Sequence, residues 1–182
     1  MFIVMTLLVW LGLGCAHEVA ANVSPYSYMV KYPWIVKIHP PIVHYAISVP
    51  IISLAFELYY ILRKRSNNTL AIILHVLSIL VITVAVLTGY VVHKAISAIP
   101  VYVEAMHILH IHQRIGFYIL AMSYAWLFLI IIYALKPYKY LKIFSIILLI
   151  LICCFVFYQS YLGGIMVYDY GLGVNIENQD WR

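Results

Sequence analysis

Four long apolar segments dominate this sequence and restrict what it can fold into. They cover residues 41–62, 70–97, 105–135 and 141–165, and as helices each is long enough to cross about 30 Å of hydrocarbon. In a bilayer every peptide group must find its hydrogen-bond partner inside the protein, and a helix supplies these partners within one segment. Hydrophobic residues form 66% of the chain and charged residues only 9%, which excludes a soluble globular domain. The predicted fold is therefore an all-α membrane protein.

The basic residues predict how the four segments are connected and oriented. Six of the eleven lie in the first and third connections: Arg63, Lys64, Arg65, Lys136, Lys139 and Lys142. Basic loops face the cytoplasm, so the chain should enter the bundle before the first helix and leave it after the fourth helix on the side of the periplasm or the exterior. Short connections predict an up-down-up-down four-helix transmembrane bundle in which the first helix is diagonal to the third and the second is diagonal to the fourth. The expected location is the bacterial inner (cytoplasmic) membrane as a multi-pass protein, with the lipid bilayer and not a nucleic acid as partner of the basic residues.

The two ends of the chain are expected to lie outside this bundle. Residues 1–21 form an apolar leader, which is either a signal peptide or a retained anchor helix, and lipidation at Cys15 is an alternative. Residues 22–40 contain three prolines, which predicts an extracytoplasmic strap. The transmembrane domain is assigned to residues 41–168, and residues 169–182 should form an extracytoplasmic tail.

Eight histidines occur in this apolar chain, and the predicted topology places six of them at the outer end of the bundle. An imidazole in hydrocarbon is costly unless it faces the bundle and has a partner, so each is a candidate functional residue. Their convergence from three helices predicts a metal or haem centre. The six residues are His39, His44, His93, His107, His110 and His112.

Two features of these segments favour haem over a bare ion. His44 and His112 begin diagonal helices, whose separation of roughly 11–14 Å fits two imidazoles and one iron. Gly89 and Gly116 lie one turn deeper than His93 and His112 and are expected to clear space for a porphyrin, although small residues also let membrane helices pack closely. We therefore predict a haem b with His44 and His112 as its axial, iron-binding ligands.

Other residues are assigned supporting roles around this centre. Arg114 at the outer interface should bind haem propionates. His39 is expected to support a ligand, bind a propionate or belong to a further centre, and His93 is the alternative ligand for the first haem. His75 and His93 share a helix face, which is typical of a two-haem helix. One haem or two are thus expected, although the inner half offers His75 no second histidine and we predict a structural role for it.

Two further groups of polar residues have simpler explanations. His107 and His110 lie on one helix face and, with Met106, could bind copper or zinc in an outer site, or they could be solvated residues on an overhanging turn. Glu57 lies shortly before the basic run 63–65 and is predicted to snorkel toward those cations, with a proton-relay role as the alternative.

Several motifs resemble those of a known family. HPPIVHYAI at 39–47, TG at 88–89, HQRIG at 112–116 and GGIMVYDYGLGV at 163–174 resemble, in order, the motifs of a widespread bacterial family of small four-helix membrane proteins. The resemblance covers about residues 38–175. It implies a membrane location and a haem-linked redox role, and it identifies His39, His44, His112, Gly163 and Gly164 as motif residues. It fixes no reaction.

The predicted function is that of a membrane-embedded b-type cytochrome that transfers electrons near the outer face. It would act as an electron-transfer subunit of a respiratory or photosynthetic redox complex, exchanging electrons with quinol, rather than as a self-contained enzyme. One alternative is a protein that binds or transports a transition metal, as a copper, zinc or iron ion, through the outer histidines. A second alternative is an assembly subunit without a cofactor.

Overall fold

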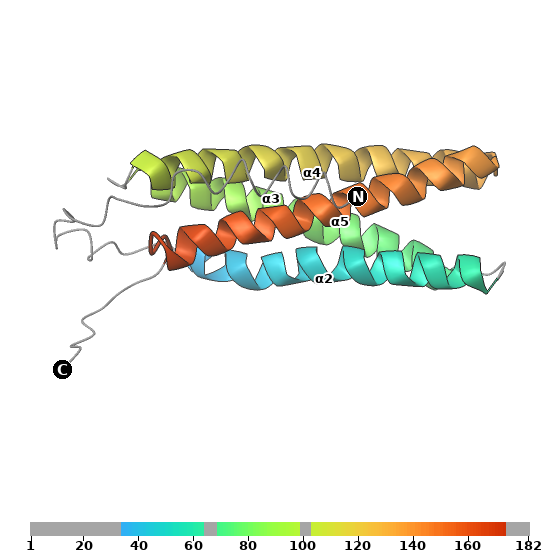
Figure 1. The fold of residues 1–182 in the computed structure, drawn as a ribbon, viewed down its shortest axis with the longest axis horizontal. Coiled ribbons are helices and arrows are strands. Elements are labelled where there is room, and N and C mark those ends of the chain that lie inside the picture. Colours follow the sequence, from blue (N-terminus) through green and yellow to red (C-terminus); the bar gives the residue numbers. More distant parts are fainter. Residues whose placement is uncertain (1–33, 64–68, 99–102, 174–182) are drawn as a thin grey trace, which may run out of the picture.

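A computed structural model describes residues 34–63, 69–98 and 103–173 of the chain. These residues form four α-helices without any strand (Figure 1): α2 (Trp34–Leu62), α3 (Thr69–Ser97), α4 (Val103–Leu135) and α5 (Lys139–Tyr168). All four are long and apolar enough to cross a membrane, which confirms the predicted fold class. The predicted leader, most of the strap and most of the tail lie outside the described residues.

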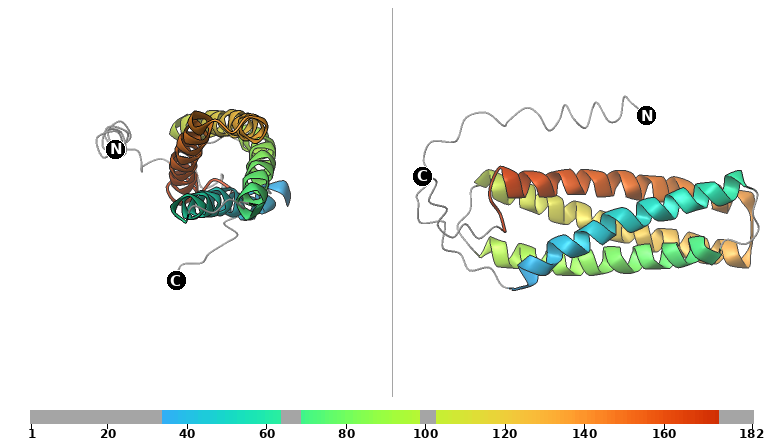
Figure 2. Two further views of the ribbon diagram at one scale, coloured as in Figure 1. Left: turned by 90° about the vertical axis from the view of Figure 1, so that its right-hand side faces the viewer. Right: turned by 90° about the horizontal axis from the view of Figure 1, so that it is seen from below.

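The helices pack in the predicted order. The backbones of α2 and α4 each approach those of α3 and α5, whereas within the described residues the backbones of α2 and α4, and those of α3 and α5, do not come close to each other. Seen end-on, the four helices occupy the corners of a square (Figure 2). The first helix of the bundle is therefore diagonal to the third, and the second is diagonal to the fourth, as the short connections predicted.

Helix α2 begins earlier than predicted, which corrects one boundary. It starts at Trp34, so the last part of the predicted strap is helical and places His39 within the bundle. The prolines Pro40 and Pro41 lie inside the helix although they lack the N–H that would complete its hydrogen bonds. Burial of Val36 in an outer apolar cluster with partners from the other three helices supports this extra turn.

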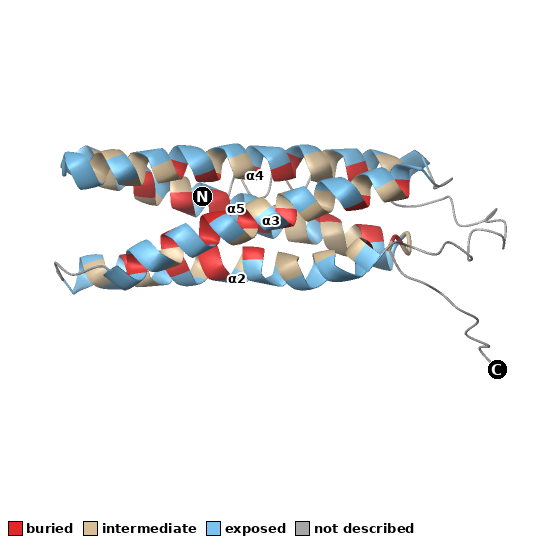
Figure 3. Cartoon of the chain, turned by 180° about the vertical axis from the view of Figure 1, so that it is seen from behind, coloured by how far each residue is buried: buried red, intermediate tan, exposed pale blue. Residues whose placement is uncertain are grey.

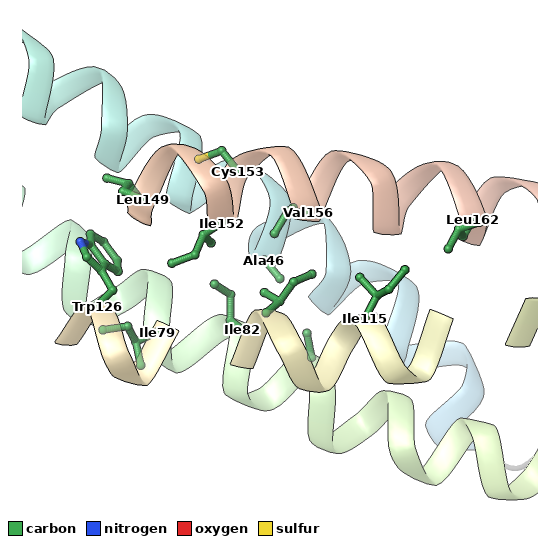
Figure 4. Close-up of a cluster of buried hydrophobic side chains, with 12 residues drawn as sticks. Ala46, Ile79, Ile82, Ile115, Trp126, Leu149, Ile152, Cys153, Val156 and Leu162 are labelled. Atoms are coloured by element: carbon green, nitrogen blue, oxygen red, sulfur yellow. The ribbon is translucent and has the colours of Figure 1, made fainter. Parts of the chain in front are cut away.

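The middle of the bundle is a tightly packed apolar core. Ile82, Ile119, Ile152 and Val156 are all buried there, and Figure 4 shows side chains of this core meeting from all four helices. Large apolar side chains also cover the outside of every helix, and buried and exposed positions alternate along them (Figure 3). Such a surface is suited to lipid. The apolar core separates two layers of polar residues, one toward each end of the bundle, and only the layer of Ser53, Glu57 and His75 is fully buried.

Candidate functional site

Six histidines lie toward the end of the bundle at which α2 and α4 begin, which we call the outer end after its predicted orientation. Only two of the six occupy the interior of the bundle. His39 comes from α2 and His112 from α4, and both are partly buried. These helices are diagonal to each other, and the two imidazoles lie close enough to interact electrostatically. The outer end of the bundle therefore does contain a pair of histidines on one diagonal, with His39 in the place that was predicted for His44.

The surroundings of His39 determine which of its ring nitrogens is available. Its Nδ1 lies 2.9 Å from the Oγ1 atom of Thr88. The single hydroxyl proton of Thr88 is directed to backbone carbonyls of its own helix, at 2.9 Å from Val84 and 3.1 Å from Ala85. Thr88 can then only accept a hydrogen bond from His39, so Nδ1 carries the ring proton. In the neutral ring the lone pair is consequently on Nε2, which no described residue contacts by a hydrogen bond.

His112 has an unsatisfied polar atom. Its Nδ1 is buried and has no hydrogen-bond partner among the described residues, and the same holds for the Oε1 atom of Gln159. The two residues are adjacent, because Gln159 on α5 donates a hydrogen bond of 2.9 Å from Nε2 to the backbone carbonyl of His112. An unsatisfied buried polar group costs about 1–3 kcal/mol. Two such atoms on neighbouring residues indicate a place where a further polar group or ligand would be stabilised.

Glycines on the other diagonal bring the histidine rings close to the neighbouring backbones. A Cβ atom added to Gly89 of α3 would lie 3.0 Å from Cε1 of His39, and one added to Gly163 of α5 would lie 3.7 Å from Cε1 of His112. Both glycines thus face the histidine pair. The layer consists of two histidines on one diagonal and two glycines on the other, an arrangement that we call the outer site: His39, Gly89, His112 and Gly163.

The spaces beside the two predicted glycines differ from the expectation. The ring of His39 fills the space beside Gly89, and the side chain of Gln159 fills that beside Gly116, where an added Cβ atom would lie 3.3 Å from Nε2. The described side chains therefore occupy the room that was predicted for a porphyrin. The absence of a side chain at Gly89 makes room for the ring of His39. At Gly116 it makes room for Gln159, which donates a hydrogen bond to the backbone carbonyl of His112.

The expectation that His44 faces His112 across the bundle is wrong. His44 is exposed, and its Nδ1 donates a hydrogen bond of 2.7 Å to the carbonyl of Pro40 on its own helix. It follows His39 by five residues and so points about 140° away around the helix. The small residues Ser48 and Ala55, which share its face, are exposed as well. That face is directed away from the bundle.

The remaining predicted residues lie on the surface near the outer end. His93 of α3 and His110 of α4 form a second pair, with 3.1 Å between Nε2 of His93 and Nδ1 of His110. His93 is partly buried, whereas His107, His110 and Arg114 are exposed. His93 is therefore separate from the interior pair. Among the described residues there is no group of three or more histidine, cysteine or acidic side chains that could hold a metal ion.

Sequence reasoning missed a second polar layer near the opposite end of the bundle. Glu57 is only 3% exposed and pairs with His75 and Lys142, so the prediction that it snorkels toward the first connection is wrong. His75, expected to be structural, is buried in the same cluster. The sequence did contain an indication that Glu57 faces the interior with His39. Glu57 follows His39 by eighteen residues, or five helical turns, so the two residues lie on the same face of the helix.

The comparisons with known proteins agree with the fold. No curated protein and no solved structure matches the chain. A family profile described as "Predicted membrane protein (DUF2231)" matches residues 36–176, a range that contains nearly all of the four helices. This match also agrees with the resemblance found in the sequence motifs, and it covers well over half of the chain. The chain therefore belongs to the DUF2231 family of predicted membrane proteins.

Proposed function

We propose that this protein is a membrane-embedded b-type cytochrome whose haem is bound between His39 and His112. One observation carries the proposal: two histidines on diagonal helices enter the bundle interior at the same end, and neither has its ring nitrogens fully satisfied by described residues. A pair of imidazoles suits haem because the porphyrin supplies the other four ligands of the iron. A bare transition-metal ion bound by this pair would need water or another group to complete its coordination.

The surroundings of the two histidines suit axial ligands of this cofactor, although the ring of His39 and the side chain of Gln159 would have to move to admit the porphyrin. Thr88 fixes the ring of His39 by accepting a hydrogen bond from Nδ1, which leaves Nε2 as the coordinating atom. Metal-binding histidines are commonly oriented by a hydrogen bond of this kind. Gln159 holds the backbone of His112 from the neighbouring helix. When bound, haem would supply an iron that exchanges single electrons. The protein's own part is to fix both imidazoles and to surround them with an apolar bundle.

The proposed partners follow from the position of the outer site. It lies in the first turns of α2 and α4, so electrons would enter and leave near one membrane surface. The basic side chains of Lys37, Lys94 and Arg114 are exposed near this end and would bind propionates or an anionic partner. We propose that the protein works as a subunit of a respiratory or photosynthetic redox complex and receives electrons from quinol or from a neighbouring subunit.

The test is a reduced-minus-oxidised absorption spectrum of the purified protein. We expect a low-spin haem signal that His39→Ala and His112→Ala each abolish. His44→Ala is the matched control, because His44 is on the same helix as His39 but is exposed, and its signal should be unchanged. Thr88→Val should keep the haem and shift its potential. The proposal fails if the protein contains no haem, or if both interior substitutions leave a full-strength low-spin spectrum.

A second candidate function rests on the pair of His93 and His110. Two imidazoles 3.1 Å apart at a partly exposed surface could bind copper or zinc, with water or a partner completing the coordination. Metal analysis of the same sample distinguishes the two functions. Bound metal that is lost in His93→Ala but retained in His112→Ala, in a protein without haem, would favour metal binding or transport. Absence of both haem and metal would favour an assembly subunit.

We also propose that the protein is in the bacterial inner membrane with the connections at 63–69 and 136–142 in the cytoplasm. The clustered basic residues of these connections support this orientation. Cysteines introduced at positions 67 and 178 test it with a reagent that does not cross membranes. Added from outside, the reagent should label Asn178→Cys and spare Asn67→Cys. The reverse pattern would invert the proposed orientation and place the outer site on the cytoplasmic side.

A further inference from the structure

The polar layer at the end opposite the outer site forms a compact hydrogen-bonded cluster. Ser53 and Glu57 come from α2, His75 from α3 and Lys142 from α5. The first three are almost completely buried, with exposures of 0%, 3% and 5%, and the side chain of Lys142 is 25% exposed. Ionisable residues inside a membrane bundle are costly, so a cluster of this kind calls for a function. We call these four residues the inner cluster.

Both ring nitrogens of His75 and both carboxylate oxygens of Glu57 have a hydrogen-bond or ion-pair partner within the inner cluster. The Nδ1 atom of His75 lies 2.5 Å from Oγ of Ser53, and its Nε2 lies 3.2 Å from Oε2 of Glu57. The other carboxylate oxygen pairs with Nζ of Lys142. The carboxylate is therefore placed between an ammonium group and an imidazole, and the imidazole between a carboxylate and a hydroxyl.

We propose that the inner cluster binds one exchangeable proton, with His75 as the group that accepts it. In the unloaded state His75 is neutral: its Nε2 proton is donated to Glu57, and the hydroxyl of Ser53 donates to Nδ1. In the loaded state the added proton is on Nδ1 and is donated to Ser53, whose hydroxyl turns to become the acceptor. The same heavy-atom contacts serve both states. The net charge of the cluster rises from zero, with Glu57 balancing Lys142, to one positive charge.

An aromatic ring packs against His75. The rings of His75 and Trp126 meet edge-on, with 4.6 Å between centroids and 64° between planes. The indole is held in place by a hydrogen bond of 2.9 Å from its Nε1 to Oγ of Ser145. Trp126 therefore helps to fix the position of the imidazole between Ser53 and Glu57.

Access to the inner cluster is one-sided. Lys142 reaches Glu57 from the first turns of α5, and its partial exposure connects the cluster to water at the end of the bundle that has the 63–69 and 136–142 connections. Its Nζ also lies 5.3 Å from the ring centroid of Tyr133 on α4. Toward the other end, the buried residues Ile82, Ile119 and Ile152 form the apolar core. The proton should therefore exchange with that nearer end only.

The proposal rests on the inner cluster alone and does not require haem. Nitrogen-15 NMR of histidine in the protein, reconstituted in lipid nanodiscs, reports the protonation of each ring, and His75→Gln identifies the signal of His75. In the unsubstituted protein we expect this signal to change from the neutral to the imidazolium form as the pH is lowered over the range in which the protein stays folded. Glu57→Gln should lower the proton affinity of His75 at least tenfold. The control Glu104→Gln, an exposed carboxylate on α4, should leave it unchanged.

Two results would overturn the proposal. One is a His75 that stays neutral throughout this pH range in the unsubstituted protein. The other is an equal proton affinity of His75 with and without Glu57. If Glu57→Gln does not fold because it leaves Lys142 unpaired, the double variant Glu57→Gln/Lys142→Gln is compared with Lys142→Gln alone, so that the two proteins differ only in the carboxylate. Lys142→Met tests access: proton exchange at His75 should become slower, and an unchanged exchange rate would contradict the one-sided route.

Discussion

The two polar layers of this bundle differ in how completely their polar atoms are hydrogen-bonded to described residues. In the inner cluster, every ring nitrogen of His75 and both carboxylate oxygens of Glu57 have partners in the protein. At the outer site, Nδ1 of His112 and Oε1 of Gln159 are buried without a described partner. Buried polar groups are almost always paired in native proteins. The comparison supports the proposal that the outer site holds a further group, whereas the polar atoms of the inner cluster are paired by its own residues.

The two layers are also far apart. His39 and Glu57 share one face of α2, and the eighteen residues between them correspond to about 27 Å along the helix. The apolar core fills the space between them. Effects of substitutions at sites this far apart usually add independently. A substitution in one layer should therefore leave the other layer intact. The predictions below test whether the two layers are independent and whether they differ in how completely their polar atoms are paired.

The largest effect is expected for Glu57→Ala. This substitution leaves the buried His75 and the partly buried Lys142 without their anion, and removing one partner of a buried ion pair typically costs about 3–5 kcal/mol. Unfolding of the purified protein by a denaturing detergent measures the loss. The folded fraction should keep the haem spectrum of the outer site. Glu104→Ala, at an exposed position, is the control and should change stability little; an equally small change for Glu57→Ala would contradict the pairing described for the inner cluster.

At the outer site, Gly89→Ala should have the next largest effect. The added Cβ atom would lie 3.0 Å from Cε1 of His39, so the ring must move away from Thr88, and overpacking of this kind costs about 1–3 kcal/mol. We expect lower stability and a weaker low-spin haem signal. Gly163→Ala is the matched control: its Cβ atom would lie at an ordinary contact distance of 3.7 Å from His112. Equal behaviour of the two variants would show that His39 is not confined by Gly89.

The fold could be predicted from the sequence because the membrane reduces the number of possible structures. The length of the apolar segments gives the four helices, and the short connections give their order around the bundle. The early start of α2 was missed because Pro40 and Pro41 are usual signs of a helix boundary. What keeps this turn helical is tertiary contact, including the burial of Val36 against other helices, and no local pattern reports such contact.

The sequence predicted His112 at the interior of the outer site but placed His44 there instead of His39. The reason is that the rotation of α2 about its own axis was misjudged. In a soluble helix the apolar face marks the interior, but in a membrane helix both faces are apolar and this signal is lost. The small residues on the face of His44, Ser48 and Ala55, are exposed and do not mark an inward face. The better guides were Ser53 and Glu57, polar residues that must face the bundle and that lie on the side of His39.

A smaller effect should follow from Trp126→Phe in the inner cluster. Phenylalanine keeps an aromatic ring beside His75 but removes the hydrogen bond from Nε1 to Ser145, a loss worth about 1 kcal/mol. Detergent unfolding should show this decrease, and the haem spectrum should not change. Trp34→Phe is the control because Trp34 is 69% exposed on α2. A decrease as large as that of Glu57→Ala would mean that the indole, rather than the ion pairs, organises the inner cluster.

The smallest effects are expected for His93→Ala and His110→Ala, which test whether proximity to the outer end is enough to make a histidine part of the outer site. The two rings contact each other at a partly exposed surface, where water can replace the lost hydrogen bond, so stability should change by less than about 0.5 kcal/mol. The low-spin haem signal should also be unchanged, in contrast to its loss in His112→Ala. Absorption spectra and detergent unfolding of the three variants make this comparison. If His93→Ala abolished the haem signal, a histidine with a protein partner would be the ligand, and the rule that unsatisfied atoms mark the binding site would fail for this bundle.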